Sequence, residues 1–565
     1  MMHSVGMMRE QIAEKVSGAL AALNLPVAGV VVEYIEDAAH GDITTNAAMV
    51  AAKAAGKAPR ALAEELLAAL GEIEGVEKIE IAGPGFINFT LTPETLAAAV
   101  AAALDQGGKW GKNDSKEGEV VMFEYTSPNL FKPLHVGNLV GNIVGESITR
   151  LLGYADADVK HINYPSDIGL TVAKGVWGLI QTKGDPKDIT ALGEAYKAGN
   201  DAYENDEAAK LEIEAVNRKL YDGSDEALNT LRAEGIATSR ARLAELCKML
   251  GTTFDAEIFE SEASPIGREI VLAHIADGIF EVSDGATIYK GEKVGLHTRV
   301  FLNSQGLPTY EAKDLGNFKL KQEKYPNWTR SIVVTGGEQK EYFKVIIAAI
   351  KEVFPEAQGK AIEHIGTGFL TLSTGKMSSR KGNVLTGESI LEDLEESARE
   401  RATESRAEDK SQLTKDIAVA ALKYQILRQG IGSDIIFDRE RALSLEGDSG
   451  PYIQYAYARA SSVIAAAAEA GVKAVVEAPQ TSDERAVARL LMQFPFIVNR
   501  AQESYESHHV ATYAAQLAGL YNGWYAREHV IGTDAAPRRT AITHAVAITL
   551  RNALYLLGIE SPMRM

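Results

Sequence analysis

The fold of this chain is decided by Ser127-Pro-Asn-Leu-Phe-Lys-Pro-Leu-His-Val-Gly-Asn138 and, much later, by Lys376-Met-Ser-Ser-Arg-Lys-Gly-Asn383. The first segment follows a short apolar run, Glu119–Tyr125, and opens a stretch of helical period from about 135 to 152. A turn between a strand and a helix exposes the N–H groups of the first helical turn, and these attract anions. Neither segment is specific by itself. Together they predict a phosphate site on a parallel sheet.

The neighbouring sequence repeats the alternation of strand and helix. A strand at Asp158–Asn163 precedes a helix at Ser166–Gln181, and the pattern returns with a strand at Ser331–Thr335 and a helix at Gln339–Val353. This order is typical of a parallel sheet with right-handed crossovers. We therefore predict an α/β multidomain protein built around a Rossmann-like parallel sheet.

Composition shifts along the chain predict four parts. An N-terminal α+β part ends in a polar, glycine-rich linker, a helical insertion interrupts the parallel sheet, and helical period dominates the last third. The predicted boundaries are 1–115 for the N-terminal part, 116–385 for the sheet with its insertion at about 185–250, 386–440 for connecting helices, and 441–565 for an all-α bundle.

Overall composition narrows the class of protein. With 565 residues, 46% hydrophobic and 24% charged, the chain is expected to form three or four globular domains. A single cysteine, Cys247, excludes a disulfide framework and a four-cysteine zinc site. The N-terminus lacks the apolar core of a signal peptide, and runs such as Ile464–Ala468 are too short to span a bilayer. We expect a cytoplasmic protein without membrane contact. The net charge of −19 still permits local basic patches.

The first segment has the geometry of a phosphate site. His135 and Asn138 are three residues apart, so both side chains lie on one helical face, and Gly137 permits close approach of a ligand. A histidine that merely caps the helix is the commoner interpretation of so short a pattern. Lys376 in the later segment supplies positive charge, and loss of one such donor typically costs on the order of 3–4 kcal/mol of transition-state stabilisation.

These two segments resemble the signature motifs of class I aminoacyl-tRNA synthetases. The surrounding sequence resembles arginyl-tRNA synthetases over nearly the whole chain, most specifically in Gly83-Pro-Gly-Phe-Ile-Asn-Phe89, in Ser-Pro-Asn-x-x-Lys before the histidine, in Glu446-Gly-Asp-Ser-Gly-Pro-Tyr-Ile-Gln-Tyr-Ala-Tyr-Ala-Arg459, and in the ending Leu556–Met565. The resemblance implies ATP-dependent activation of L-arginine and its transfer to tRNA(Arg). It also implies an additional N-terminal domain on the D-loop side of the tRNA, and a C-terminal anticodon-binding domain.

The resemblance assigns residues to the chemical step. The catalytic residues would be Lys132, His135, Asn138 and Lys376, and ATP would further contact Ser127, Gly137, Met377 and Ser378. Two positions depart from the family pattern, because Asn138 replaces a histidine and Ser379 replaces a lysine. For members with the second change, the resemblance implies that the lysine upstream of the histidine takes its place, here Lys132. ATP is expected as its Mg²⁺ complex, with no zinc and no organic cofactor.

The amino-acid pocket implied by the resemblance is acidic. It consists of Glu124, Asn129, Glu260, Tyr310, Asp314 and Gln339. Tyr310 and Asp314 are spaced i,i+4, so a helix over 310–320 would turn both into one pocket, where Asp314 would bind the guanidinium. Any single acid among the 77 in the chain is more often a solvated surface group. A pocket for a buried cation rejects neutral analogues by roughly 10⁴-fold, so no editing domain is expected.

The candidate tRNA contacts lie at both ends of the chain, and the resemblance implies three of them, Tyr452, Tyr455 and Met565. The candidates are Phe86 and Asn88 in the N-terminal part, and Tyr452, Tyr455, Trp524 and Met565 in the C-terminal part. Aromatic rings at such spacing on helices are more often core residues. The resemblance adds that tRNA binds before activation, and we expect a monomer. The alternatives are a class I synthetase for another amino acid and a non-catalytic tRNA-binding paralogue. A small-molecule nucleotidyltransferase would leave the C-terminal helices unexplained.

Overall fold

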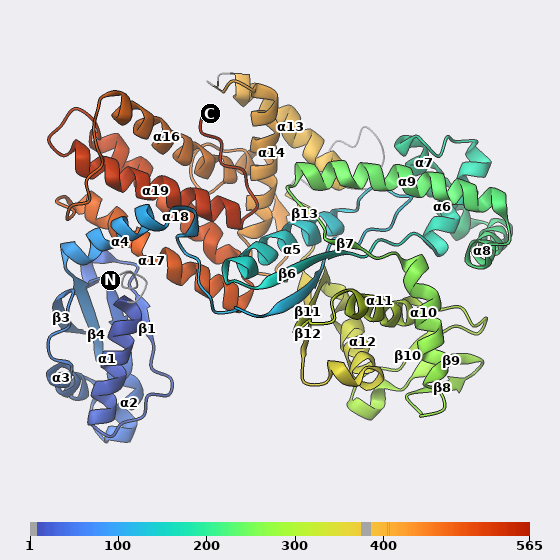
Figure 1. Ribbon diagram of the computed structural model, residues 1–565, viewed down its shortest axis with the longest axis horizontal. Coiled ribbons are helices and arrows are strands. Elements are labelled where there is room, and N and C mark those ends of the chain that lie inside the picture. Colours follow the sequence, from blue (N-terminus) through green and yellow to red (C-terminus); the bar gives the residue numbers. More distant parts are fainter. Residues whose placement is uncertain (1–7, 374–385, 404, 406) are drawn as a thin grey trace.

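The computed structural model describes residues 8–373, 386–403, 405 and 407–565. A small α+β unit lies at one end of the molecule, a helical bundle and a parallel sheet occupy the middle, and the other end includes helices α6–α9 (residues 170–249) (Figure 1). The segment 374–385, which includes Lys376, Met377, Ser378 and Ser379, lies outside the described residues.

The N-terminal unit is an antiparallel sheet with helices against it, as predicted. Its elements are α1 (Met8–Ala22), β1 (Val32–Tyr34), β2 (Ile43–Thr45), α2 (Ala47–Ala55), α3 (Pro59–Leu70), β3 (Val76–Ala82) and β4 (Phe86–Leu91). The strand order is β1-β2-β4-β3. The hairpin between β3 and β4 requires Gly85, because its φ is +146° and an added Cβ would lie 3.0 Å from the backbone of Pro59.

The central sheet has five parallel strands in the order β12-β11-β5-β6-β7. These strands are β5 (Val120–Glu124), β6 (Asp158–Asn163), β7 (Ala256–Glu257), β11 (Arg330–Gly336) and β12 (Ala361–Thr367). Each connection contains helices, as parallel strands require. The predicted parallel-sheet fold class is therefore confirmed.

Helices and one small sheet complete the central part. The helices are α5 (Val136–Tyr154), α6 (Leu170–Thr182), α7 (Ile189–Asn205), α8 (Glu207–Asp222), α9 (Glu226–Met249), α10 (Glu260–Ala273), α11 (Tyr310–Lys324) and α12 (Lys340–Val353). Helices α7 to α9 form the predicted helical insertion. A three-stranded antiparallel sheet between α10 and α11 was not predicted; it contains β8 (Phe280–Ser283), β9 (Ala286–Tyr289) and β10 (Arg299–Leu302).

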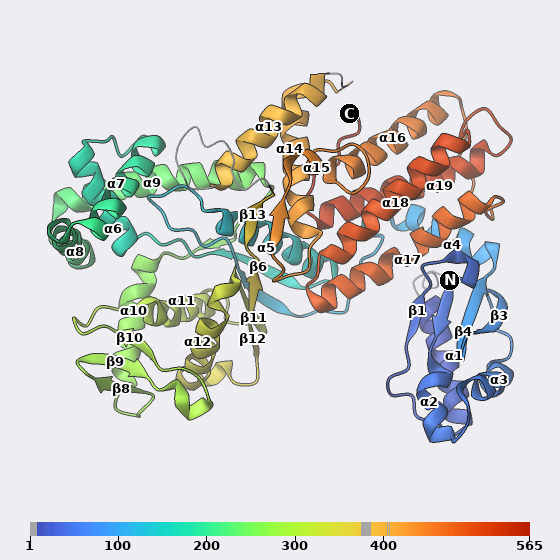
Figure 2. The ribbon, with the colours of Figure 1, turned by 180° about the vertical axis from the view of Figure 1, so that it is seen from behind.

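The last third is helical except for one short strand. It contains α13 (Gly387–Thr403), α14 (Lys410–Leu427), β14 (Ile435–Phe437), α15 (Arg439–Ala442), α16 (Gly450–Glu469), α17 (Ser482–Ser504), α18 (His508–Arg527) and α19 (Ala536–Leu556). Strand β14 pairs in parallel with β13 (Leu370–Leu372), which joins this part to the central domain (Figure 2). Within the described ranges, no helix has the length and hydropathy needed to cross a membrane.

The N-terminal unit is fixed to the C-terminal bundle by buried groups. Helix α4 (Pro93–Gln106) packs against α17 and α19. Trp110, in the predicted polar linker, is buried against Phe494. Asp42 is also buried and forms ion pairs with Arg485 at 2.8 Å and Arg489 at 3.1 Å. These contacts make the position of the N-terminal unit part of the folded structure.

Candidate active site

A strained loop after β5 carries the first motif. Thr126, Ser127 and Phe131 have φ values of 76°, 37° and 66°, which non-glycine residues rarely adopt. Asn142 holds Thr126 by donating to its Oγ1 at 2.9 Å, and the buried ring of Phe131 lies where Cβ atoms on Gly175 and Gly235 would collide with it. Residues in such conformations are typical of ligand sites, because the surrounding structure must hold them there.

His135 is the N-cap of α5. Its Nδ1 accepts a hydrogen bond from Gly137 N at 3.1 Å, and the side chain is exposed. Partial burial and the positive charge of Lys132 lower the pKa of His135, which keeps the ring neutral. Because Nδ1 accepts, the proton of the neutral ring is on Nε2. The histidine therefore caps the helix and still offers an N–H to an anion.

Asn138 and Lys132 flank the histidine. The Asn138 amide donates to Thr126 O at 2.9 Å, so it fixes the strained loop to the helix. Lys132 is half-buried, its Nζ lies 5.7 Å from the ring centroid of Tyr196, and burial lowers its pKa. Tyr196 belongs to α7, so the helical insertion contributes to the surroundings of this lysine. Gly137, at the exposed first turn of α5, leaves space beside the histidine.

Backbone contacts bring the chain after the lysine-rich segment to the histidine. Thr386 forms an antiparallel bridge with His135, and Gly387 N donates to Leu134 O at 2.9 Å. Thr386 is the first described residue after the segment that contains Lys376. The start of α13 (Gly387–Thr403) is thus held beside the histidine motif.

The acidic residues gather on one face of the sheet beneath α11. Glu124, the last residue of β5, is buried and accepts hydrogen bonds at its Oε2 from Asn317 and Lys321, each at 2.8 Å. Glu124 and Asp314 line the same cavity, together with Asn317, Lys321 and side chains from β11 and α12. The predicted proximity of Glu124 and Asp314 is therefore found.

Asp314 has no lysine or arginine partner among the described ion pairs. Tyr342 donates to its Oδ2 at 2.7 Å. Burial raises the pKa of Asp314 to about 7, and the negative charge of Glu124 adds to this effect while the Tyr342 hydrogen bond opposes it. A half-buried carboxylate whose charge is disfavoured in this way gains from a cationic ligand.

Glu260 and Tyr310 complete one side of the acidic cluster. Glu260 is buried at the start of α10 and accepts a hydrogen bond from Lys313 Nζ at 2.6 Å. The Tyr310 ring centroid lies 5.2 Å from the same Nζ, and 59% of this tyrosine is exposed. Tyr310 thus lies at the mouth of the cluster, on the same helix as Asp314.

Asn129 and Gln339 lie at the rim. Asn129 is half-buried in the strained loop and bridges to Ser166. Gln339 is exposed at the end of a 3₁₀ turn, Gly337–Gln339, directly after β11. Both follow the carboxyl ends of strands, where ligands bind in parallel sheets. Among the described residues, neither side chain forms a hydrogen bond with Asp314.

Sequence reasoning missed the positive groups of the pocket. Lys313, Asn317 and Lys321 share the face of α11 that carries Tyr310 and Asp314, and both lysines are buried. Their spacing was a usable signal, because positions i, i+3, i+4, i+7 and i+11 align on a helix. The spacing did not reveal that the lysines pair with acids from β5 and α10.

Aromatic and cationic side chains cluster on the C-terminal helices. Arg459 donates to the hydroxyl of Tyr455 at 2.9 Å and to Asn522 at 2.6 Å. Its guanidinium lies 4.6 Å from the Tyr455 ring centroid and 5.2 Å from that of Tyr525. Tyr455 and Tyr525 are partly exposed. Rings and cations in this arrangement can stack on unpaired bases.

The predicted tRNA contact of Trp524 is wrong for this structure. Trp524 is fully buried beside Tyr521. A base cannot reach its ring, because the residue faces the interior of the bundle. Tyr452 and Met565 are only partly buried against the same core. Their proposed contacts remain predictions.

The two predicted tRNA contacts of the N-terminal unit differ in exposure. Phe86 is 37% exposed at the start of β4. Asn88 is largely buried and accepts a hydrogen bond from Thr44 Oγ1 at 2.7 Å. The ring is therefore available to a partner, whereas the amide already has one within the sheet.

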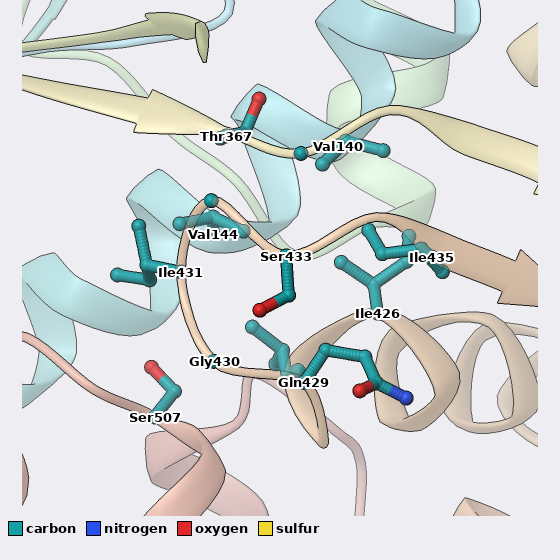
Figure 3. A pocket seen from close by; sticks show the side chains of 13 residues that line it. Val140, Val144, Thr367, Ile426, Gln429, Gly430, Ile431, Ser433, Ile435 and Ser507 are labelled. Atoms are coloured by element: carbon teal, nitrogen blue, oxygen red, sulfur yellow. The ribbon is translucent and has the colours of Figure 1, made fainter.

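A second cavity lies between α5 and the loop after α14 (Figure 3). It is lined mainly by Val140, Val144, Ile426, Ile431 and Ile435, and the lining contains no charged side chain among the described residues. Its apolar walls do not suit a charged substrate. We interpret this cavity as a gap in the packing between α5 and α14.

Comparison with known proteins agrees with this geometry. The family model described as tRNA synthetases class I (R), catalytic domain, matches residues 99–439. The arginyl tRNA synthetase N terminal domain matches residues 8–91, and the DALR anticodon binding domain matches residues 453–565. The fold and the site thus define a class I aminoacyl-tRNA synthetase.

Similar whole proteins identify the amino acid. The chain is 30% identical to the arginine–tRNA ligase of Limosilactobacillus reuteri over 571 residues, which covers 99% of this chain and all of that protein. It is 29% identical to the corresponding ligase of Streptococcus pneumoniae over 573 residues. The solved arginyl-tRNA synthetase of Thermus thermophilus superimposes with a TM-score of 0.79 at 26% identity, covering 99% of this chain and 100% of that chain.

The chain belongs to the arginyl-tRNA synthetase family. It is a ligase that activates L-arginine with ATP and transfers it to the 3′ end of tRNA(Arg). The expectations for the fold, the enzyme class and the amino acid are confirmed. The alternatives, a synthetase for another amino acid and a non-catalytic paralogue, are not supported.

Proposed function

We propose that the loop after β5 and the pocket beneath α11 are two halves of one active site. The proposal rests mainly on the end of β5. Glu124, its last residue, lies in the acidic pocket, and Thr126, two residues later, begins the loop of the histidine motif. Arginine placed in the pocket would direct its carboxylate toward a triphosphate held by the loop. The carboxylate then attacks the α-phosphorus, and pyrophosphate leaves.

In the ATP half, positive and N–H groups stabilise the transferring phosphate. His135 offers Nε2–H, Lys132 offers a charge, and Lys376 would supply a second charge. Ser127, Gly137, Asn138, Met377 and Ser378 complete the proposed ATP contacts. Mg²⁺ enters with ATP as part of the substrate complex. Catalysis here is mainly positioning and charge stabilisation, because phosphoryl chemistry needs little covalent help.

In the arginine half, the carboxylate of Asp314 binds the guanidinium. The absence of a described cationic partner and the raised pKa of Asp314 support this role. Tyr310 covers the mouth, Glu124 and Glu260 contribute negative charge, and Asn129 and Gln339 contact the arginine from the rim. If all five are ionised, the buried Glu124, Glu260, Lys313 and Lys321 and the half-buried Asp314 together carry one negative charge, which matches a monocation.

The proposed tRNA-binding surface uses both ends of the chain. Tyr452, Tyr455 and Met565 face the anticodon side, and Phe86 and Asn88 face the D-loop side. We further propose that tRNA binds before activation, that the enzyme is a cytoplasmic monomer, and that the four predicted parts with boundaries near 115, 385 and 440 act as its domains.

Arginine-dependent exchange of pyrophosphate into ATP tests the proposal. Exchange is expected with arginine alone among the twenty amino acids, and only when tRNA(Arg) is present. Equal rates with and without tRNA would contradict ordered binding. Exchange that survives Asp314→Asn with an unchanged arginine requirement would contradict the assigned pocket.

A further inference from the structure

Tyr164 lies directly after β6, beside the end of β5. Ile162 pairs with Glu124, so the two side chains share one face of the sheet. Tyr164, two residues further along, packs in the same buried cluster as Ile162 and Leu315 of α11. The tyrosine therefore lies in the core beside the acidic cluster, close enough for the charges of Glu260, Asp314 and Glu124 to act on it, and it was not among the residues predicted from sequence.

The hydroxyl of Tyr164 has no hydrogen-bond partner anywhere in the described chain. The residue is only 7% exposed. A buried hydroxyl without a partner is costly, and such groups are rare in folded proteins. A hydroxyl left in this condition at the edge of a ligand pocket is suited to a partner that arrives with the ligand.

The electrostatic surroundings indicate which ligand groups fit. Burial raises the pKa of Tyr164 well above its ordinary value, and the negative charges of Glu260, Asp314 and Glu124 add to this effect. The hydroxyl therefore stays neutral and keeps lone pairs that can accept hydrogen bonds. Carboxylates are acceptors themselves, so they do not satisfy these lone pairs. A cation with several N–H groups does.

We propose that the Tyr164 hydroxyl is a specificity-determining contact that accepts a hydrogen bond from the guanidinium of bound arginine. Guanidinium has five N–H donors and no acceptor, and Asp314 offers only two oxygens, one of which Tyr342 already contacts. Tyr164 adds an acceptor for an N–H group of the guanidinium that Asp314 does not contact. The inference rests on the assignment of the acidic cluster as the arginine pocket.

A purely structural role for Tyr164 makes a different prediction. The ring packs in a hydrophobic cluster, and Tyr164→Phe keeps the ring while removing only the hydroxyl. Because that hydroxyl has no described partner, its loss leaves no group unpaired and should not lower stability. Binding and folding are therefore separable with one conservative variant.

The experiment compares wild type with Tyr164→Phe in pyrophosphate exchange with tRNA(Arg) present. The KM for arginine is expected to rise about 10-fold or more, which is a typical loss for a hydrogen bond to a charged group. The kcat, the KM for ATP and the melting temperature should stay unchanged. Tyr521→Phe, at a buried tyrosine of the C-terminal bundle, is the matched control and should leave the KM for arginine unchanged.

Two outcomes would overturn the inference. One is an unchanged KM for arginine in Tyr164→Phe, and the other is a lower melting temperature with all kinetic parameters altered. The variant Asp314→Asn distinguishes a failure of the role proposed for Tyr164 from a failure of the arginine-pocket assignment. If Asp314→Asn raises the KM for arginine and Tyr164→Phe does not, only the role of Tyr164 fails; if neither does, the pocket assignment fails as well.

Discussion

Lys321 Nζ lies 2.8 Å from Glu124 Oε2, and both groups are buried beneath α11. Asn317 donates to the same oxygen, so the helix fixes the orientation of a carboxylate that belongs to the sheet. The strand-end acid is thus paired within the protein itself. Two lysines of one helix, Lys313 and Lys321, each neutralise one acid, and Asp314 of the same helix has no such partner among the described ion pairs.

Lys321→Met is expected to destabilise the protein strongly. Removal of one member of a buried ion pair leaves an unpaired charge, which typically costs about 3–5 kcal/mol. The melting temperature should fall accordingly in thermal unfolding followed by circular dichroism. Lys319→Met is the control, because Lys319 is partly exposed on the same helix and pairs with Glu323 at 3.3 Å.

The double variant Glu124→Gln/Lys321→Met separates charge from packing. With both charges removed, no buried charge stays unpaired, so much of the lost stability should return. If Lys321→Met is as stable as Lys319→Met, the buried pair does not contribute as the geometry indicates. If the double variant is no better than Lys321→Met, the defect is one of packing.

Asp314 should make arginine use depend on pH near neutrality. Burial raises its pKa to about 7, and a guanidinium binds the ionised form. The kcat/KM for arginine is therefore expected to rise as the pH increases through about 7. The variant Asp314→Asn should lose that pH dependence. Its KM for arginine should be about 10²-fold higher than that of the wild type. Steady-state exchange over a pH series measures both effects. A profile that is the same in wild type and variant would contradict the assignment.

The raised pKa of the Asp314 carboxyl also predicts how the free energy of unfolding changes with pH. Because its pKa in the folded state is higher than in the unfolded chain, folding takes up a proton between the two values. Asp314 therefore makes the arginine-free protein less stable as the pH rises toward about 7, and this part of the pH dependence should be missing in Asp314→Asn. Thermal unfolding of the two proteins across that range compares them directly.

The sheet and its helices were predictable because their signals are local. The strand at Asp158–Asn163 was predicted with the bounds of β6, and the helix at Gln339–Val353 differs from α12 by one residue. Period, turn residues and the Ser-Pro-Asn motif act over short stretches of chain. The β8–β9 hairpin was missed although Asp284-Gly285, a strong turn signal, lies between its strands.

The pocket was only partly predictable because burial depends on distant residues. Lys313 and Lys321 are charged positions on a polar helix, so the sequence favours solvent for both. They are buried only because Glu260 and Glu124 arrive from α10 and β5. Trp524 is the converse case. Its helix carries both exposed and buried aromatic rings, and the packing of α18 in the bundle determines which of these rings are buried.

Lys132→Ala is expected to slow the chemical step. Lys132 is half-buried beside the histidine motif, and its charge acts on His135. Loss of one charge-stabilising donor typically costs about 10²–10³ in kcat. Pyrophosphate exchange should fall by that factor with little change in the KM for arginine, and Lys376→Ala should behave alike. Lys187→Ala, at a well-exposed lysine of the insertion, is the control. A normal kcat in Lys132→Ala would exclude Lys132 from catalysis.

Tyr455→Ala and Trp524→Ala should fail in different ways. Tyr455 is partly exposed and stacks with Arg459. Loss of one base-stacking ring typically costs about 1–3 kcal/mol of binding free energy, so the KM for tRNA should rise about 10-fold or more in Tyr455→Ala. The melting temperature of this variant should stay nearly unchanged. Trp524 is fully buried, and its truncation typically costs about 3–5 kcal/mol of stability. Aminoacylation at varied tRNA concentration and thermal unfolding distinguish the two variants. If Tyr455→Ala lowers stability as much as Trp524→Ala, Tyr455 is a core residue, and the tRNA surface on α16 must lie elsewhere.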